Sequence, residues 1–288
     1  MAKFYDKFDR KDKGTPANSK PEDRERSGRR PGSKKKFDPN RPLKSGPPAV
    51  ATGPIRLNRF IANAGICSRR DADLLIKEGK IKVNGKVETQ MGVKVDPAID
   101  RIEYNNKFLH SQKFVYLLLN KPKNYITTTE DEKGRHTVME LVTQYTNERV
   151  YPVGRLDRNT TGLLLFTNDG DLAEKLTHPS NEVKKIYHVK LNKAADSQTI
   201  KALKDGLELE DGFIKVDAAD YVAGAGPDEI GVILHSGKNR VVRRIFDKLG
   251  FEVLALDRTG LGNLSKKGLS RGKARFLTEK EVGFIKMG

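Results

Sequence analysis

One acidic side chain stands between two arginines near the middle of the chain. Asp157 lies in the segment GRLDRNTTGLLLFTNDG (154–170), flanked by Arg155 and Arg158 and followed by the apolar run 162–166. A carboxylate beside cations stays ionised, because opposite charge favours the charged form. A loop that leads into a buried strand holds such a group rigidly. The segment therefore predicts a loop carboxylate able to act as base or nucleophile. A turn aspartate that bonds its own backbone is the alternative.

Three further segments accompany this one. Leu-Asn-Lys-Pro occupies 119–122, Lys-Ile-Tyr-His-Val occupies 185–189, and Gly-Lys-Asn-Arg-Val-Val-Arg-Arg occupies 237–244. In this order they resemble the catalytic domain of the pseudouridine synthases that modify ribosomal RNA. The most similar branch is the group of the small-subunit synthase A and the large-subunit synthase B, and the segment 239–244 is more similar to the large-subunit type. The likeness covers roughly residues 55–281.

The resemblance implies that the chain isomerises a uridine of ribosomal RNA to pseudouridine, by breaking the C1′–N1 bond and rejoining the uracil through C5. Asp157 would be the catalytic carboxylate, either a nucleophile at C1′ or a base that takes the 2′ proton. Tyr187 would stack on a uracil flipped out of its helix, and Arg243 would pair with Asp157. Candidates for holding RNA phosphate or sugar around that uracil are Arg155, Thr161, Lys121, Asn239 and Arg240.

Other interpretations of the same residues remain open. Without the resemblance, 239–244 is a solvated basic helix face and Tyr187 an ordinary strand tyrosine. Val241 stands where relatives often carry glutamate, and Lys238 where arginine is usual. A non-catalytic RNA-binding or ribosome-assembly factor of the same fold is one rival function. The same reaction on small-subunit or transfer RNA is another.

The reaction gains no group and oxidises nothing, so no redox cofactor, nucleotide or metal is expected. The sequence contains no dinucleotide fingerprint, P-loop or metal-ligand cluster. The single cysteine, Cys67, cannot form an internal disulfide, which favours reducing, cytoplasmic surroundings. We expect a monomer.

The elements that must position these residues belong to an α+β domain, predicted over 113–288. Strand-type runs occupy 114–119, 162–166, 186–191 and 231–234, and helical spacing marks 171–176, 197–203 and 239–249. Several links between strand runs are too short for helical crossovers. The sequence therefore predicts a mainly antiparallel mixed sheet.

A smaller basic module is predicted over 54–112. It contains a helix at 57–64 stopped by Gly65, a second helix that starts at Ser68 and is stopped by Gly79, and a hairpin centred on Asn84-Gly85. This pattern resembles the RNA-binding domain named after ribosomal protein S-four. Arg69 and Arg70, at the start of the second helix, are the candidate RNA contacts, because helix N-termini favour phosphate.

The first 53 residues have a different composition. Residues 1–50 contain 15 lysines and arginines and 7 acidic residues, which contributes +8 of the chain's net charge of +17. We expect this proline-rich segment to be a disordered basic tail. The pI of 9.7 favours a polyanionic partner, and ribosomal RNA or a pre-ribosomal particle fits it. We expect no membrane association, because no apolar run has the length of a bilayer span or a signal peptide.

Overall fold

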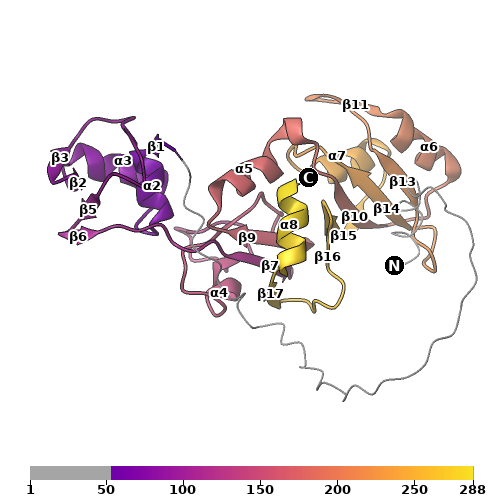
Figure 1. The fold of residues 1–288 in the computed structure, drawn as a ribbon. Helices are drawn as coiled ribbons and strands as arrows, with labels where there is room; N and C mark the ends of the chain where they lie inside the picture. Colours follow the sequence, from indigo (N-terminus) through magenta and orange to yellow (C-terminus); the bar gives the residue numbers. More distant parts are fainter. Residues whose placement is uncertain (1–52, 288) are drawn as a thin grey trace, which may run out of the picture.

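The computed structural model describes residues 53–287, so the predicted tail lies outside the described residues except for its last position. The described chain folds into two separate parts (Figure 1). One core is built from residues between Ile55 and Leu109, and the clusters of the second part begin at Phe114. The chain therefore forms a small N-terminal domain and a larger C-terminal one.

The small domain pairs two helices with short antiparallel strands. Helix α2 (Leu57–Asn63) buries Leu57, Phe60 and Ile61, and helix α3 (Arg69–Lys77) packs beside it. The Ser68 hydroxyl accepts the Asp71 amide N–H, and the Asp71 carboxylate accepts the Ser68 N–H, so the predicted capping box is present. The strands are β1 (Ile55–Arg56), β2 (Ile81–Val83), β3 (Lys86–Glu88), β4 (Lys94–Val95), β5 (Ile102–Tyr104) and β6 (Lys107–Phe108).

A nine-stranded sheet forms the centre of the large domain. Its main path runs β13-β14-β10-β15-β9-β7-β17, with β16 beside β15 and β8 beside β9. The strands are β7 (Tyr116–Lys121), β8 (Tyr151–Pro152), β9 (Thr160–Thr167), β10 (Lys185–Leu191), β13 (Ala218–Tyr221), β14 (Glu229–Leu234), β15 (Val253–Leu261), β16 (Leu264–Ser265) and β17 (Ala274–Phe276). Within residues 53–287, β9 and β15 are the one parallel pair of this sheet. The predicted mainly antiparallel α+β fold is confirmed.

Helices and a hairpin cover the sheet. Helices α6 (Ser197–Asp205) and α7 (Val241–Lys248) share one buried cluster with β10 and β14, whereas α5 (Gly170–Thr177) and α8 (Glu279–Met287) share another with β7 and β9. Helix α4 (Met139–Val142) packs on β7 and β9 in a third cluster. The remaining elements are η2 (Pro179–Asn181), β11 (Leu207–Leu209) and β12 (Gly212–Ile214). The sheet is thus a buried support from which loops at its edges emerge.

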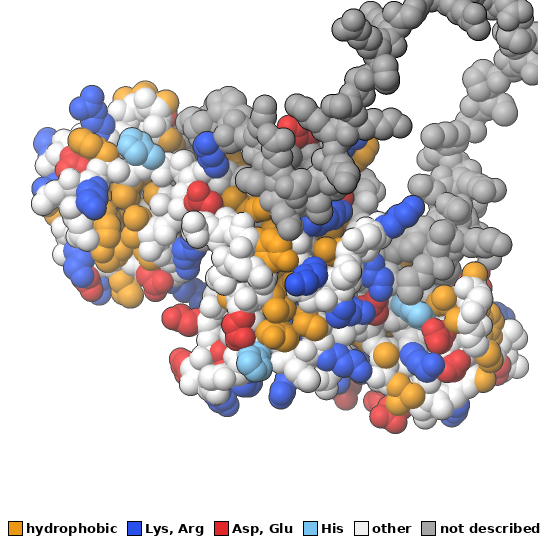
Figure 2. Space-filling view, turned by 90° about the horizontal axis from the view of Figure 1, so that it is seen from below, with side chains coloured by type: hydrophobic (Ala, Val, Ile, Leu, Met, Phe, Trp, Pro, Cys, Tyr) orange, Lys and Arg blue, Asp and Glu red, His pale blue; other side chains and the backbone are white. Residues whose placement is uncertain are grey.

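An ion pair joins the domains, between Arg59 of α2 and Asp171 at the start of α5. In the segment that leads into the large domain, the Gln112 backbone N–H donates to the Asn63 carbonyl at 3.0 Å. Figure 2 shows lysine and arginine side chains spread over one face of both domains, with acidic side chains between them. Across the described part of the chain, no helix combines the length and apolar character needed to span a bilayer.

Candidate active site

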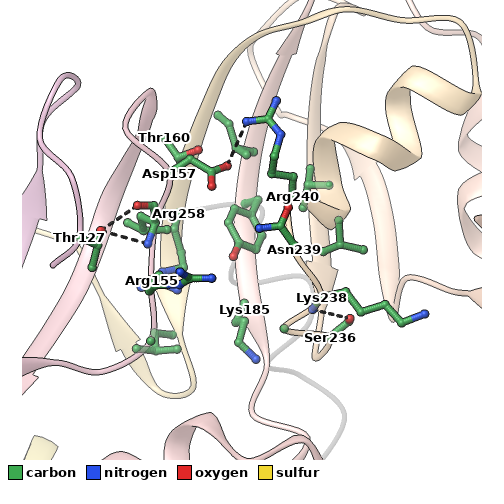
Figure 3. A pocket seen from close by; sticks show the side chains of 18 of the residues that line it. Thr127, Arg155, Asp157, Thr160, Lys185, Ser236, Lys238, Asn239, Arg240 and Arg258 are labelled. Atoms are coloured by element: carbon green, nitrogen blue, oxygen red, sulfur yellow. Dashed lines mark hydrogen bonds and ion pairs between the residues drawn. The ribbon is translucent and has the colours of Figure 1, made fainter. Parts of the chain in front are cut away.

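A cavity of about 490 Å³ opens between two loops of the large domain. One loop, 153–160, enters β9, and the other, 236–240, precedes α7 (Figure 3). Tyr187, Leu256 and Arg258 contribute to the lining from strands of the sheet. The volume lies in the range of sites that hold small ligands. Six cationic residues line this cavity: Arg155, Arg158, Lys185, Lys238, Arg240 and Arg258. Among residues 53–287, Asp157 is the one acidic residue in the lining. Such a site attracts anions.

Asp157 sits in a tight turn before β9. The Thr160 N–H donates to the Asp157 carbonyl at 3.0 Å, which closes the turn, and the carboxylate projects into the cavity (Figure 3). Asp157 Oδ2 lies 3.7 Å from Arg240 Nη1. The Asp157 side chain is 34% exposed and that of Arg240 53%, so this ion pair is worth only about 0.2–1 kcal/mol. The carboxylate is therefore open to solvent from one side.

Arg243, which the sequence predicted as the partner of Asp157, instead contacts the backbone of β15. Its Nη1 donates to the Val253 carbonyl at 2.9 Å, its Nε is buried without a partner, and it forms no ion pair with Asp157 in the described structure. Burial and the neighbouring Arg240 charge lower the pKa of Arg243, whereas the Asp157 carboxylate raises it. The reason is the helix boundary. Arg240 is the N-cap of α7, with a left-handed φ of 47°, and it extends toward Asp157, whereas Arg243 lies one turn into the helix and contacts β15.

Lys121 and Thr161 are not free to hold phosphate or sugar, contrary to the prediction. Lys121 is fully buried, and its ammonium donates to the carbonyls of Asp157 at 3.1 Å, Arg158 at 3.3 Å, Thr160 at 2.9 Å and Pro122 at 3.1 Å. Burial lowers the pKa of Lys121 to about 8, and the Asp157 charge opposes this shift. The Thr161 hydroxyl donates to Asp257 Oδ1 at 2.6 Å on the other face of the sheet. Both residues support the loop that carries Asp157.

The remaining candidates of the large domain do line the cavity. Tyr187 on β10 pairs directly across from Arg258 on β15. Arg155 comes from the Asp157 loop, and Asn239 comes from the facing loop (Figure 3). Arg244, at the end of the same basic segment, points elsewhere and makes a two-point ion pair with Asp211 at 2.9 and 2.8 Å. The basic segment thus divides between the cavity and the packing of the β11–β12 hairpin.

Arg258 is the cavity residue that the sequence did not identify. It is 3% exposed, and its Nε donates to the Leu163 carbonyl at 2.8 Å. Gly162 makes this placement possible: a Cβ there would lie 2.2 Å from the Arg258 carbonyl oxygen, and the backbone has a φ of +107° that favours glycine. The one arginine of the strand-type run 253–261, beside Asp257, was the available signal.

Arg69 and Arg70 lie far from this cavity in the chain and in the fold. Both are exposed on the first turn of α3 in the small domain, where backbone N–H groups without helical partners also face solvent. They are available to an external anion.

Comparison with known proteins places this geometry in a family. Residues 115–248 match the family model described as RNA pseudouridylate synthase, and residues 55–98 match the S4 domain. The ribosomal large subunit pseudouridine synthase B of Bacillus subtilis is 43% identical over 79% of this chain and 93% of its own. An RNA pseudouridine synthase of Aquifex aeolicus is 41% identical over 79% of this chain and 92% of its own. A crystal structure of a pseudouridylate synthase superposes with a TM-score of 0.57, at 25% identity, over 80% of this chain and 99% of that one.

The chain therefore belongs to the RNA pseudouridine synthases, enzymes that isomerise uridine within RNA. It carries an S4 domain at the N-terminal side of the catalytic domain.

Proposed function

We propose that this enzyme converts a uridine of large-subunit ribosomal RNA to pseudouridine, with Asp157 as the catalytic carboxylate. The observation that supports this role most directly is the composition of the cavity, where the Asp157 carboxylate lies among six cations and shares the lining with Tyr187. The relative from Bacillus subtilis, named as a large-subunit synthase B, supports the choice of RNA. A relative from Pasteurella multocida, 40% identical over 75% of this chain and 65% of its own, has the same name.

The target base must leave its helix to reach Asp157, because C1′ and C5 are shielded within a stack. Arg155 and Arg240 are exposed at the cavity and are suited to the phosphates on either side of the flipped nucleotide. Tyr187 offers a ring for stacking. Asp157 then attacks C1′ or removes the 2′ proton, and in either route the C1′–N1 electron pair leaves with the uracil. The ring turns and C5 bonds to C1′. In the first route this releases the Asp157 carboxylate from C1′, and in the second Asp157 returns the proton to C2′. C5 then loses its proton and N1 gains one.

The small domain is proposed to dock folded RNA through Arg69 and Arg70. Their exposed guanidinium groups and the free N–H groups at the start of α3 are complementary to phosphate. Specific RNA recognition favours loops and bulges, from which a uridine is flipped at low cost.

The experiment that tests catalysis is the substitution Asp157→Asn, which keeps the shape of the side chain and removes its charge. We expect pseudouridine formation in a large-subunit ribosomal RNA transcript to become undetectable, while the affinity for that RNA, measured by filter binding, stays within about twofold. Asp205→Asn, at the exposed end of α6, is the matched control. Normal conversion by Asp157→Asn would leave only an RNA-binding role for this residue.

Mapping pseudouridines in cells with and without the gene tests the substrate. We expect one modified position of the large-subunit RNA to be lost. A position lost instead from small-subunit or transfer RNA would refute the assignment of the substrate while retaining the reaction.

We further propose that the enzyme acts in the cytoplasm as a monomer, in keeping with a single cysteine and with a cavity formed by one chain. Cell fractionation and light scattering on the purified protein test these two points.

A further inference from the structure

Arg258 differs from every other cation of the cavity by its burial. Its Nε is used by the Leu163 carbonyl, and its Nη2 is shielded from solvent without a hydrogen-bond partner. Within residues 53–287, no carboxylate lies within ion-pair distance of it. Burying a charged group without a partner is costly, so such a group is retained where a ligand or the reaction requires it.

The other cations already have a use. Arg155, Arg158 and Arg240 are exposed and are suited to phosphates. Lys185 donates to the carbonyls of Val183 at 3.0 Å and His235 at 2.7 Å, and Lys238 donates to the Asp211 carbonyl at 2.7 Å. Arg258 alone combines burial, a donor without a partner and a place in the cavity lining.

Arg258 lies where it can contact a flipped base, and not where it can contact a backbone phosphate. It extends from β15 in the sheet that forms the base of the cavity, directly across from Tyr187 and beside the first residues of β9. Phosphates stay near the open rim, where the exposed arginines lie, whereas a flipped base enters the buried part of a site. Arg258 therefore lies in the part of the cavity where the ring of a flipped base would enter.

We infer that Arg258 donates a hydrogen bond to a carbonyl oxygen of the flipped uracil, O2 or O4, and so stabilises the uracil when the C1′–N1 bond breaks. This inference rests on the proposed function. The detached uracil keeps the electron pair of that bond, and the resulting negative charge spreads over N1, O2 and O4. A fixed, desolvated guanidinium is suited to this charge, because it needs no reorganisation as the charge develops.

A contact to O4, unlike one to O2, also disfavours cytosine. Arginine has donors and no acceptor, whereas C4 of cytosine carries an amino group in place of the carbonyl of uracil. A donor facing a donor in a buried site leaves both without a partner, and sites of this kind discriminate strongly against the wrong ligand.

The test is an internal competition between uridine and its thiocarbonyl analogues. Large-subunit ribosomal RNA is transcribed with uridine mixed with 4-thiouridine, or with 2-thiouridine, and the digested product is analysed by mass spectrometry for pseudouridine and thiopseudouridine. The ratio of the two products reports discrimination and does not depend on how much enzyme is folded. We expect Arg258→Gln to change this ratio by about tenfold relative to wild type for one of the two analogues, as the loss of one charge-assisted hydrogen bond implies.

Arg155→Gln is the matched control, because it removes a cation of the same cavity from the phosphate-binding rim. We expect it to lower the yield of both products and to leave their ratio unchanged. Arg258→Lys, which keeps the charge and loses the fork of donors, is expected to change the ratio in the same direction as Arg258→Gln, and it decides the question if the glutamine variant does not fold.

The inference is overturned if the ratio is the same in wild type and the Arg258 variants. It is equally overturned if wild-type enzyme uses uridine and both analogues at equal rates. A wild-type enzyme that forms no pseudouridine in this RNA would contradict the proposed function instead.

Discussion

Replacing Lys121 by methionine should remove the buried hydrogen bonds that hold the Asp157 loop in place. The Lys121 ammonium is fully buried and bonds the carbonyls of Asp157, Arg158 and Thr160. Hydrogen bonds from a charged donor contribute about 1.5–3 kcal/mol each, so three of them amount to roughly 6 kcal/mol. Methionine also removes the cost of burying the charge. That cost, together with the opposing Asp157 charge and the repulsion from Arg271, appears as the shift of the Lys121 pKa from 10.5 to about 8, which corresponds to roughly 3 kcal/mol.

The net loss is therefore about 3 kcal/mol in the free energy of unfolding, or a fall in Tm of about 6–12 °C for a chain of this size. The loop keeps two other bonds, from the Thr160 N–H to the Asp157 carbonyl and from the Asn124 N–H to the Arg158 carbonyl. We therefore expect a displaced loop in a folded protein. A displacement of about 1 Å at a reacting group costs roughly 100-fold in kcat.

The assay combines calorimetry with the kinetics of pseudouridine formation in the large-subunit RNA transcript. We expect Lys121→Met to lower Tm and kcat with KM for RNA little changed, and Lys123→Met, an exposed neighbour in the same segment, to change neither. If Lys121 contacted phosphate, KM would rise with Tm unchanged. That result would refute the role derived from the buried contacts.

Three other outcomes follow from the contacts. Arg240→Gln should lower kcat by no more than about fivefold, because a half-exposed ion pair contributes up to about 1 kcal/mol, whereas loss of the proposed phosphate contact raises KM; a 100-fold loss in kcat would mean that Arg240 acts on the reacting atoms. Burial of Glu281 opposes its ionisation, but Arg275 and Thr278 outweigh this effect and hold the pKa of Glu281 below 4.5. The contribution of Glu281 to the free energy of unfolding is therefore present above about pH 4.5 and is lost as pH falls through the lowered pKa. Glu281→Gln should then cost about 1 kcal/mol near pH 7 and nothing below the lowered pKa in denaturant titrations, with Glu279→Gln as the control. The double substitution of Arg69 and Arg70 by glutamine should reduce the salt dependence of RNA binding, measured by fluorescence anisotropy, by about 1.4–1.8 in logarithmic slope, and an unchanged slope would exclude phosphate contacts there.

The sequence predicted much of the fold because its local signals agree with one another. The capping box at Ser68 and the Asn84-Gly85 turn, where both residues have positive φ, appear where the pattern placed them. The strand runs at 114–119, 186–191 and 231–234 correspond to β7, β10 and β14. The parallel pairing of β9 with β15 was not predictable from local pattern, because it joins segments nearly 100 residues apart.

The sequence predicted which segments form the site, but not which of their side chains point into the cavity. Asp157, Tyr187 and Arg240 line one cavity, but Thr161 points away from it while Thr160 lines it. Neighbouring strand residues face opposite sides, so a one-residue uncertainty in register exchanges a cavity residue for a supporting one. The exchange of Arg243 for Arg240 has a similar origin, since it depends on the residue at which α7 begins.

Gly162 lets β15 lie close to β9, the strand that follows the Asp157 loop. The Arg258 backbone pairs with Gly162 in parallel register, and the Arg258 side chain bonds the next residue, Leu163. One residue earlier, Asp257 accepts the Thr161 hydroxyl on the opposite face of the sheet. The loop that carries Asp157 is thus fixed by Lys121 from β7 and by β15 from the other side, and the second of these strands also delivers a buried cation to the cavity. Any shift of β15 along β9 would move Arg258 relative to Asp157, so the distance between the carboxylate and the proposed uracil contact depends on strand register as well as on the conformation of the loop.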